Sequence, residues 1–490
     1  MPLPASPMGA PKGDVPVTDS TALDGSTRTL RRGALGPLNV LAIAVAAISP
    51  TTSVFLVYGA GLASAGTGVI WAFLIGAVIA LAMAYSYAEM GSMFPSAGGA
   101  YTIVRRGLGP VWGGITLVLF LVLGVVITAS ILLAAATYLA QLIGGLPVSL
   151  VALAMMAVIT ALSVGKISPA SWVAGLMLAV ELVVILTFTA LAFLHPALGA
   201  DPLTHPSVPG PHGGLLAVGA AGMIAAIVPA LFAYNGYDWP LYFAEESRDA
   251  RRVLPRAVML AVVISVVIEV LAVVAATLAI KDLPATAANA APLSLIAHRI
   301  MGPVGADLLL VGVVIAMFDT GLAGNLAYAR IYFAASRDRM WPGPVNEFFG
   351  HLGARSRVPV YGFMVLFVGN AVLCVFTSLN NLITFTGVII VVIYLLVAAS
   401  AIVARVRDKG LARPFTMPLW PVPPLIAIAG VAIALSQQTH SDLVITAIII
   451  LLAAAAYLAV RHRLPARLTV GALAATDPED PVGVVAQRHR

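Results

Sequence analysis

Long apolar runs dominate the pattern of hydrophobic and polar positions along the chain. Runs of about 20 mostly apolar residues recur from end to end, with short polar segments between them. As a helix, such a run covers the roughly 30 Å hydrocarbon layer of a bilayer. The pattern therefore predicts an all-α polytopic membrane protein with about twelve transmembrane helices, near residues 36–62, 68–94, 112–143, 148–164, 168–194, 215–246, 253–280, 304–335, 358–377, 381–404, 423–438 and 442–461.

The composition agrees with this interpretation, and the charges orient the chain. Of the 490 residues, 60% are hydrophobic and 10% are charged, which places the chain in the membrane class. Arginine and lysine gather in alternate connections, and the remaining connections hold only Lys281 and Arg299. Because positively charged loops stay inside, we expect a multi-pass protein of the cell membrane with both termini in the cytoplasm. The net charge of +6 is then a topology signal and implies no nucleic-acid partner.

The two ends of the chain differ from the apolar middle. Residues 1–32 are rich in Pro, Ser and Asp and contain no early apolar run, so we expect a disordered cytoplasmic tail and no cleavable signal. Residues 462–490 are expected to form a second cytoplasmic tail. One domain at 33–461 would then hold every span. Its single cysteine, Cys374, excludes an internal disulfide.

The first span contains a break signal near the middle of the bilayer. Ser49-Pro50 lies about 13 residues after Gly36, which is close to the midplane at 1.5 Å per residue. Proline lacks an N–H and disfavours helical geometry at the preceding residue. We therefore expect two half-helices, with Ser49 at the cap and free N–H groups at Thr51 and Thr52. The positive end of such a half-helix suits a carboxylate. A proline kink repaired by neighbouring helices is the alternative.

The sixth span repeats this signal in the stretch "FAYNGYDWPLYF". Asn235-Gly236 lies well inside the apolar run, and Pro240 follows shortly after. Two interrupted helices that are five spans apart run in opposite directions, which is the signature of an inverted five-plus-five repeat. We expect the repeats at about 36–194 and 215–404, with two extra helices at 423–461.

Four motifs resemble those of the amino acid-polyamine-organocation (APC) permeases. They are "YAEMGSMFPSAGGAYTIVRRGLGPVWG" (87–113), "FAYNGYDWPLYFAEESRDARRVLPRAV" (232–258), "ARIYFAASRDRMWPGPVNEFF" (329–349) and "RPFTMPLWPVPP" (413–424). The resemblance implies the inverted-repeat fold, alternating access, and a substrate site between spans one, three, six, eight and ten. It also implies secondary active transport of an amino acid or small amine, and not an enzyme. Where family members often carry a Gly-Ser-Gly-like triplet, this chain has Ser-Pro-Thr-Thr.

The sixth-span break supplies most of the remaining candidate substrate residues. At the break, Tyr234 and Asn235 offer a phenol and an amide beside Gly236, and Phe232 could cover the substrate. Asp238 is a carboxylate at membrane depth, which is costly enough to suggest a function. In polyamine and arginine carriers of the family the matching position is often acidic, so the resemblance implies contact with a cationic group. An N-cap for the half-helix at Pro240 is the alternative.

Three further carboxylates are candidates for coupling transport to protons. Glu181 is flanked by apolar residues for many positions, and its match in some proton-coupled members is a lysine. An unpaired charge there is costly, so the group must find a partner or stay protonated. Glu269 and Asp319 are weaker candidates of the same kind. Glu89 is expected to form a structural ion pair near Arg105 and Arg106.

Other function classes find little support in the sequence. No Walker motif appears, which argues against a nucleotide partner, and the histidines of the segment 195–214 match no metal signature. We therefore expect no cofactor, with transport driven by the proton gradient. Two alternatives stay open: an exchanger of one solute for another, and a membrane receptor built on a transporter fold.

Overall fold

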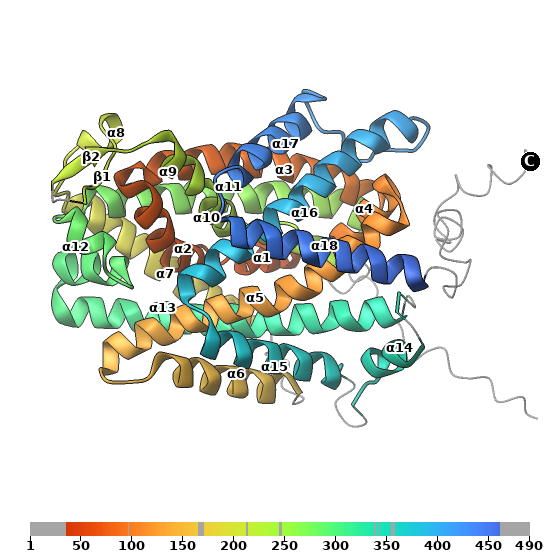
Figure 1. Cartoon of the computed structure of the whole chain (residues 1–490), viewed down its shortest axis with the longest axis horizontal. Coiled ribbons are helices and arrows are strands. Elements are labelled where there is room, and N and C mark those ends of the chain that lie inside the picture. Colours follow the sequence, from red (N-terminus) through yellow and green to blue (C-terminus); the bar gives the residue numbers. More distant parts are fainter. Residues whose placement is uncertain are drawn as a thin grey trace, which may run out of the picture.

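A computed structural model describes residues 36–96, 98–164, 171–211, 214–244, 247–337, 340–341, 343–353 and 358–460. The two expected tails, 1–32 and 462–490, lie outside the described residues. Within the described part the chain is almost entirely helical, and most helices run along one common direction (Figure 1). At one end of the bundle lie the short helices α8 and α12 with the hairpin β1–β2, and at the other end lie α4 and α14.

The helices and strands follow one another in a single series. In chain order they are α1 (Pro37–Ile48), α2 (Pro50–Ala65), the 3₁₀ helix η2 (Gly66–Gly68), α3 (Val69–Met93), α4 (Gly99–Leu108), α5 (Pro110–Ile143), α6 (Val148–Val164), α7 (Ser171–Leu194), α8 (Asp201–Thr204), β1 (Ser207–Pro209), β2 (Leu215–Ala217), α9 (Ala220–Ala225), α10 (Ile227–Ala233), the 3₁₀ helix η3 (Trp239–Phe243), α11 (Ala250–Leu278), α12 (Leu283–Ala287), α13 (Pro292–Arg337), α14 (Gly343–Gly350), α15 (Val360–Phe376), α16 (Leu379–Arg407), α17 (Val422–Leu435) and α18 (His440–Val460).

These helices form a multi-pass membrane protein. Among the described residues, seven helical stretches are long and apolar enough to cross a membrane, and four shorter apolar helices accompany them. The stretch Pro37–Met93 has 57 residues, which is about 85 Å of helix and more than one crossing. Large apolar side chains on the outside, such as Val78, Leu271 and Leu308, suit contact with lipid. The count of about twelve spans and the inverted repeat stay predictions.

One predicted span, at 215–246, was wrong in its bounds. The span expected at 215–246 begins as strand β2, because Leu215–Ala217 pairs antiparallel with Ser207–Pro209, and its helices occupy only 220–225, 227–233 and 239–243. The span expected at 304–335 agrees with the part of α13 that follows an interruption at Gly302, where φ is 69°. The short helices α4, α12 and α14 were not predicted, since they are too short to show as apolar runs.

The first predicted break is present where the sequence places it. α1 ends at Ile48 and α2 begins at Pro50, and between them Ser49 has φ 50° and ψ 75°, a left-handed conformation that is uncommon for a residue with a side chain. The predicted serine cap is absent, because the Ser49 side chain makes no capping hydrogen bond to α2. Pro50 at the first helical position has no N–H to satisfy, which suits the start of a helix.

The second break packs directly on the first. α10 ends at Ala233, and η3 begins at Trp239 after a turn in which Gly236 has φ 124°. A methyl group added at Gly236 would lie 2.8 Å from both the carbonyl oxygen of Ala47 and the nitrogen of Ile48. Only a glycine allows this close approach of two backbones. The two interrupted helices therefore meet in the middle of the bundle.

Candidate functional site

A small cavity lies between the two breaks. Its volume is about 30 Å³, and its wall comes from α1, α2, α5, α10, the second break and α13. The polar lining includes Thr52, Ser53, Asn235, Thr320 and Tyr328. This volume is well below the ~300 Å³ of an ordinary ligand pocket, so the site is closed in this conformation.

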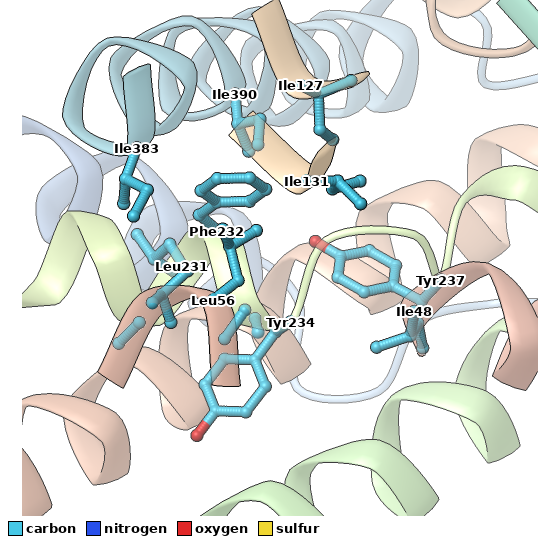
Figure 2. Close-up of a cluster of buried hydrophobic side chains, with 14 of the residues drawn as sticks. Ile48, Leu56, Ile127, Ile131, Leu231, Phe232, Tyr234, Tyr237, Ile383 and Ile390 are labelled. Atoms are coloured by element: carbon cyan, nitrogen blue, oxygen red, sulfur yellow. The ribbon is translucent and has the colours of Figure 1, made fainter. Parts of the chain in front are cut away.

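Apolar and aromatic side chains form the rest of the wall. Phe232, buried and only 5% exposed, lines the cavity together with Leu56, Ile127 and Ile131. Figure 2 shows the Phe232 ring near these isoleucines, with Ile390 next to it and Ile383 on the side away from Ile131. The Trp239 ring completes the wall and contacts Tyr328 edge to face, at 6.0 Å between centroids. A cavity with an apolar wall and a few polar groups is suited to an amphipathic small molecule.

Ser53 ties the two breaks together. Its hydroxyl lies 2.7 Å from the carbonyl oxygen of Ile48 in the first break and 2.7 Å from that of Ala233 in the second. A carbonyl at the end of a half-helix lacks an intrahelical partner, and the single proton of the Ser53 hydroxyl is shared between these two oxygens. Ser53 was not among the residues predicted from the sequence. The run Thr-Thr-Ser after Pro50 was the available signal.

Glu181, a residue of α7, contacts the N-terminal end of α2. The N–H of Thr51 donates to its Oε1 at 3.1 Å, and the Thr51 hydroxyl donates to its backbone carbonyl at 2.7 Å. Glu181 is 4% exposed. The Thr51 N–H, which was predicted to bind a substrate carboxylate, therefore binds a carboxylate of the protein itself. This is the kind of group expected at a helix N-terminus.

The hydroxyl group of Thr320, on α13, also lies at the first break. The Thr320 hydroxyl lies 2.9 Å from the Ser49 hydroxyl and 3.0 Å from the Thr52 hydroxyl. Its neighbour in the chain, Asp319, is partly buried. The structure thus gathers Ser49, Thr51, Thr52, Glu181 and Asp319 around one break.

Glu269 on α11 is completely buried. In the described part of the chain neither of its carboxylate oxygens has a hydrogen-bond partner. A buried carboxyl group without partners is costly when charged. Glu269 is not among the residues that line the cavity.

The candidates of the second break point in different directions. Asn235 lines the cavity, and its Nδ2 donates to the Tyr394 hydroxyl at 3.1 Å. Tyr234 points away from the cavity, and its hydroxyl donates to the carbonyl of Phe73 at 3.0 Å. Figure 2 shows the Tyr234 and Tyr237 rings on different sides of the chain. Gly236 supplies backbone contact with the first break.

Asp238 lies outside the cavity wall, among tyrosines. It is 3% exposed, its Oδ2 accepts a hydrogen bond from Tyr242 at 3.0 Å, and its Oδ1 has no partner among the described residues. Its side chain caps no helix. Asp238 occupies the N-cap position of η3, so the N-cap alternative holds for its place in the chain and not for a capping hydrogen bond.

Glu89 forms the expected ion pair with other partners. Arg405 binds both carboxylate oxygens at 2.6 Å each, and Arg413 binds Oε1 at 2.9 Å. The Met417 N–H donates to Oε2 at 2.7 Å. Both arginines follow far along the chain, which is why the sequence suggested the nearer Arg105 and Arg106. This cluster anchors the connection between α16 and α17 to the end of α3.

A multi-pass helical protein in which two interrupted helices meet at a closed, partly polar cavity has the architecture of a membrane permease. A family model described as amino acid permease matches residues 35–462. The chain belongs to this family, and it is accordingly an amino acid transporter of the APC superfamily and not an enzyme.

The individual relatives have low sequence identity to this chain, and their names give different amino acids as substrates. The chain is 24% identical over 404 residues to the serine/threonine exchanger SteT of Bacillus subtilis, covering 80% of this chain and 88% of the relative. It is 24% identical over 437 residues to the branched-chain amino acid permease BcaP of the same organism, covering 84% and 89%. Human cationic amino acid transporter 4 is 25% identical over 412 residues, covering 79% of this chain and 62% of the relative.

Proposed function

We propose that the protein is a secondary active transporter that imports an amino acid or related small amine across the cell membrane by alternating access, driven by the proton gradient. The observation that carries this proposal is the contact between the two helix breaks at the cavity. An inverted repeat of five-plus-five helices within a twelve-helix fold would place two such breaks together. Both termini lie in the cytoplasm in this proposal, and no cofactor takes part.

The cavity has the groups that an amino acid requires. Thr52 and Ser53 lie at the N-terminal end of α2, where the helix dipole favours a carboxylate. Asn235 offers an amide that can orient the substrate, and Phe232 covers the apolar side. Because the cavity is closed, α1 and α10 must move apart from α5 and α13 before a substrate enters. This requirement favours a carrier that alternates between conformations.

Glu181 is the proposed proton carrier. In this structure its carboxylate accepts a hydrogen bond from the N–H of Thr51 at the start of α2. Protonation removes its charge and weakens its hold on this N–H, so the positive end of the half-helix becomes free for the substrate carboxylate. Proton and substrate then enter together. Glu269, which is completely buried, and Asp319, which precedes Thr320 on the α13 side of the first break, are the secondary candidates.

Exchange of one solute for another is the second candidate function. The likeness to a serine/threonine exchanger favours it. An exchanger uses the same cavity and needs no proton carrier, so the role of Glu181 separates the two functions. A receptor built on this fold would bind an amino acid and transport none.

A thermal-shift screen of the purified protein against amino acids and amines tests the site. A ligand that binds the folded state raises the unfolding temperature. Gly324 lines the cavity, so Gly324→Leu should fill it and abolish the shift. The matched control is Gly175→Leu, where nothing lies within 4 Å of an added Cβ on an apolar helix. A shift that survives Gly324→Leu would place the ligand elsewhere.

A further inference from the structure

Buried polar residues gather between α3 and α11, away from the cavity wall. They are Ser86 on α3 and Ser265 and Glu269 on α11, and we call these three residues the α3–α11 seam. The two helices lie side by side in the bundle (Figure 1), and each of the three residues is 0% exposed. In the described part of the chain both serine hydroxyls and both carboxylate oxygens of Glu269 lack a hydrogen-bond partner. Because a buried polar atom without a partner is costly, the seam suits a ligand that forms hydrogen bonds.

Glu269 lies at about the depth of the first helix break. α2 and α11 run toward the same end of the bundle, because the helices that follow them, η2 and α12, both contact β1. The hydroxyls of Tyr58 on α2 and Thr277 on α11 are 2.9 Å apart, which aligns the two helices. Pro50 precedes Tyr58 by as many residues as Glu269 precedes Thr277, so Pro50 and Glu269 have about the same depth. α11 also packs against α7, the helix of Glu181.

The two serines lie further toward the arginine-rich end of the bundle. Ser265 precedes Glu269 by one turn on the same face of α11. A Cβ added at Gly61 of α2 would lie 2.8 Å from Val69, which aligns α3 with α2. Counted from this contact at about 1.5 Å per residue, Ser86 is within about one helical turn of Ser265 in depth. The seam therefore extends from the depth of the first break toward the end of α3.

The serines of the seam differ from several other buried hydroxyl residues of the long helices. A serine or threonine within a helix commonly donates to a carbonyl of the preceding turn. Thr128, Ser163 and Ser400 do so in this chain. Ser86 and Ser265 have no such bond among the described residues. Their hydroxyl groups are therefore available to another partner.

Water that carries a proton is the ligand that these groups suit. No basic side chain hydrogen-bonds to Glu269 in the portion that the structure describes. A carboxyl group can hold a proton and release it, and a serine hydroxyl both donates and accepts, so it can continue a chain of hydrogen-bonded water molecules. Serine hydroxyls alone cannot hold the proton at neutral pH, which leaves this role to Glu269.

Other titratable groups face this part of α11 from the neighbouring helices. The described ones on α2, α3, α7 and η3 are Tyr58, Tyr85, Tyr87, Glu89, Glu181 and Tyr242. Tyr58 is bonded to Thr277, and Glu89 binds two arginines. Glu181 is the carboxylate among them that the proposed function already assigns to the proton.

We propose that the α3–α11 seam is the route by which the coupling proton leaves Glu181 toward the arginine-rich end, with Glu269 as an intermediate proton holder and water bound at Ser265 and Ser86. This inference rests on the proposed proton-driven transport. The Glu181 carboxyl gives its proton through water to the Glu269 carboxylate, and Glu181 regains its negative charge and its bond from the Thr51 N–H. Glu269 then gives the proton to water at the serines and becomes charged again.

Proton entry and substrate exchange, measured in the same proteoliposomes, test the route. An internal pH dye follows proton entry during uptake, and labelled substrate follows exchange without a gradient. Ser86→Ala and Ser265→Ala each remove one hydroxyl and should slow proton-coupled uptake by at least about threefold, the factor for one ordinary hydrogen bond. Exchange should continue at the unaltered rate, because it needs no net proton movement.

Matched variants separate the route from a general effect on folding. Ser400→Ala is the control, because Ser400 is also 0% exposed on a long helix but donates to the Leu396 carbonyl of its own helix. Glu269→Gln should abolish proton entry and keep exchange, whereas Glu269→Asp retains a carboxyl group and should restore part of the proton entry. If Glu269→Gln does not fold, the two serine variants decide.

Four results would overturn the inference. Unaltered proton entry in Ser86→Ala and Ser265→Ala removes the seam from the route and leaves the proposed transport intact. An equal loss of proton entry and exchange in the seam variants means that the seam serves the fold alone. Stabilisation by sodium chloride and not by choline chloride, lost in Glu269→Gln, makes the seam a sodium site. Exchange without any proton entry in the unaltered protein removes the proposed driving force and the route together.

Discussion

At the scale of single residues, the chemistry of Glu181 was predictable and its partner was not. A lone carboxylate within an apolar run signals a function from the sequence alone. The sequence also suggested free N–H groups after Pro50. The carboxylate and the N–H group are partners, because the Thr51 N–H donates to Glu181 Oε1. This bond depends on the packing of α7 against α2. Contacts over 130 positions leave no mark in a local pattern.

Replacing Glu181 with glutamine tests the proton carrier. Glutamine keeps the size of the side chain and an acceptor oxygen, but it neither loses nor gains a proton in the physiological pH range. We expect Glu181→Gln to bind and exchange substrate, and to lose accumulation driven by an inward pH gradient in proteoliposomes. Glu269→Gln and Asp319→Asn, measured in parallel, show whether a neighbour has this role. Gradient-driven accumulation by Glu181→Gln at the unaltered level would rule out the assignment.

At the scale of elements, the sequence predicted both helix breaks but not how they meet. Ser49-Pro50 and Asn235-Gly236 carry local signals, because proline and glycine act on the backbone in which they occur. The bridging hydroxyl of Ser53 and the contact of Gly236 with Ala47 are tertiary features. The strand at 215–217 was missed for another reason, since three residues are too few to show a strand pattern, although its partner Ser207–Pro209 is close in the sequence.

Gly236→Ala tests the contact between the breaks. The added methyl group would meet the backbone of Ala47 and Ile48 at 2.8 Å, and the φ of 124° is strained for alanine. We expect transport to fall by at least about tenfold, a cost of 1.4 kcal/mol or more. Gly219→Ala is the control, with no atom within 4 Å of the added Cβ and an ordinary φ of −79°. Equal loss in both variants would mean that the contact has no special role.

At the scale of the whole molecule, ion pairs at the arginine-rich end join segments that are far apart in the sequence. Glu89 of α3 binds Arg405 of α16 and Arg413 of the following connection, and it is 0% exposed. The alternation of charged loops predicted that this end is rich in arginine. The alternation did not predict which arginine binds which carboxylate, because several loops lie close together at that end.

Glu89→Gln should destabilise the fold. The substitution leaves two partly buried arginines without their counter-charge, and breaking a buried pair in this way costs about 3–5 kcal/mol. Asp249→Asn removes a carboxylate from an exposed pair, 3.9 Å from Arg252, and should change stability by less than about 1 kcal/mol. Thermal unfolding of the two variants side by side provides the comparison. Unfolding temperatures that match for the two variants would contradict the structural role of Glu89.

Uptake of amino acids by the unmodified protein in proteoliposomes tests the central claim most directly. Liposomes with an inward pH gradient are given each labelled amino acid that stabilises the protein, and the internal concentration is followed over time. The proposal predicts accumulation above the external concentration that collapses when a proton ionophore is added. Binding without any uptake or exchange, in liposomes with or without the gradient, would contradict it.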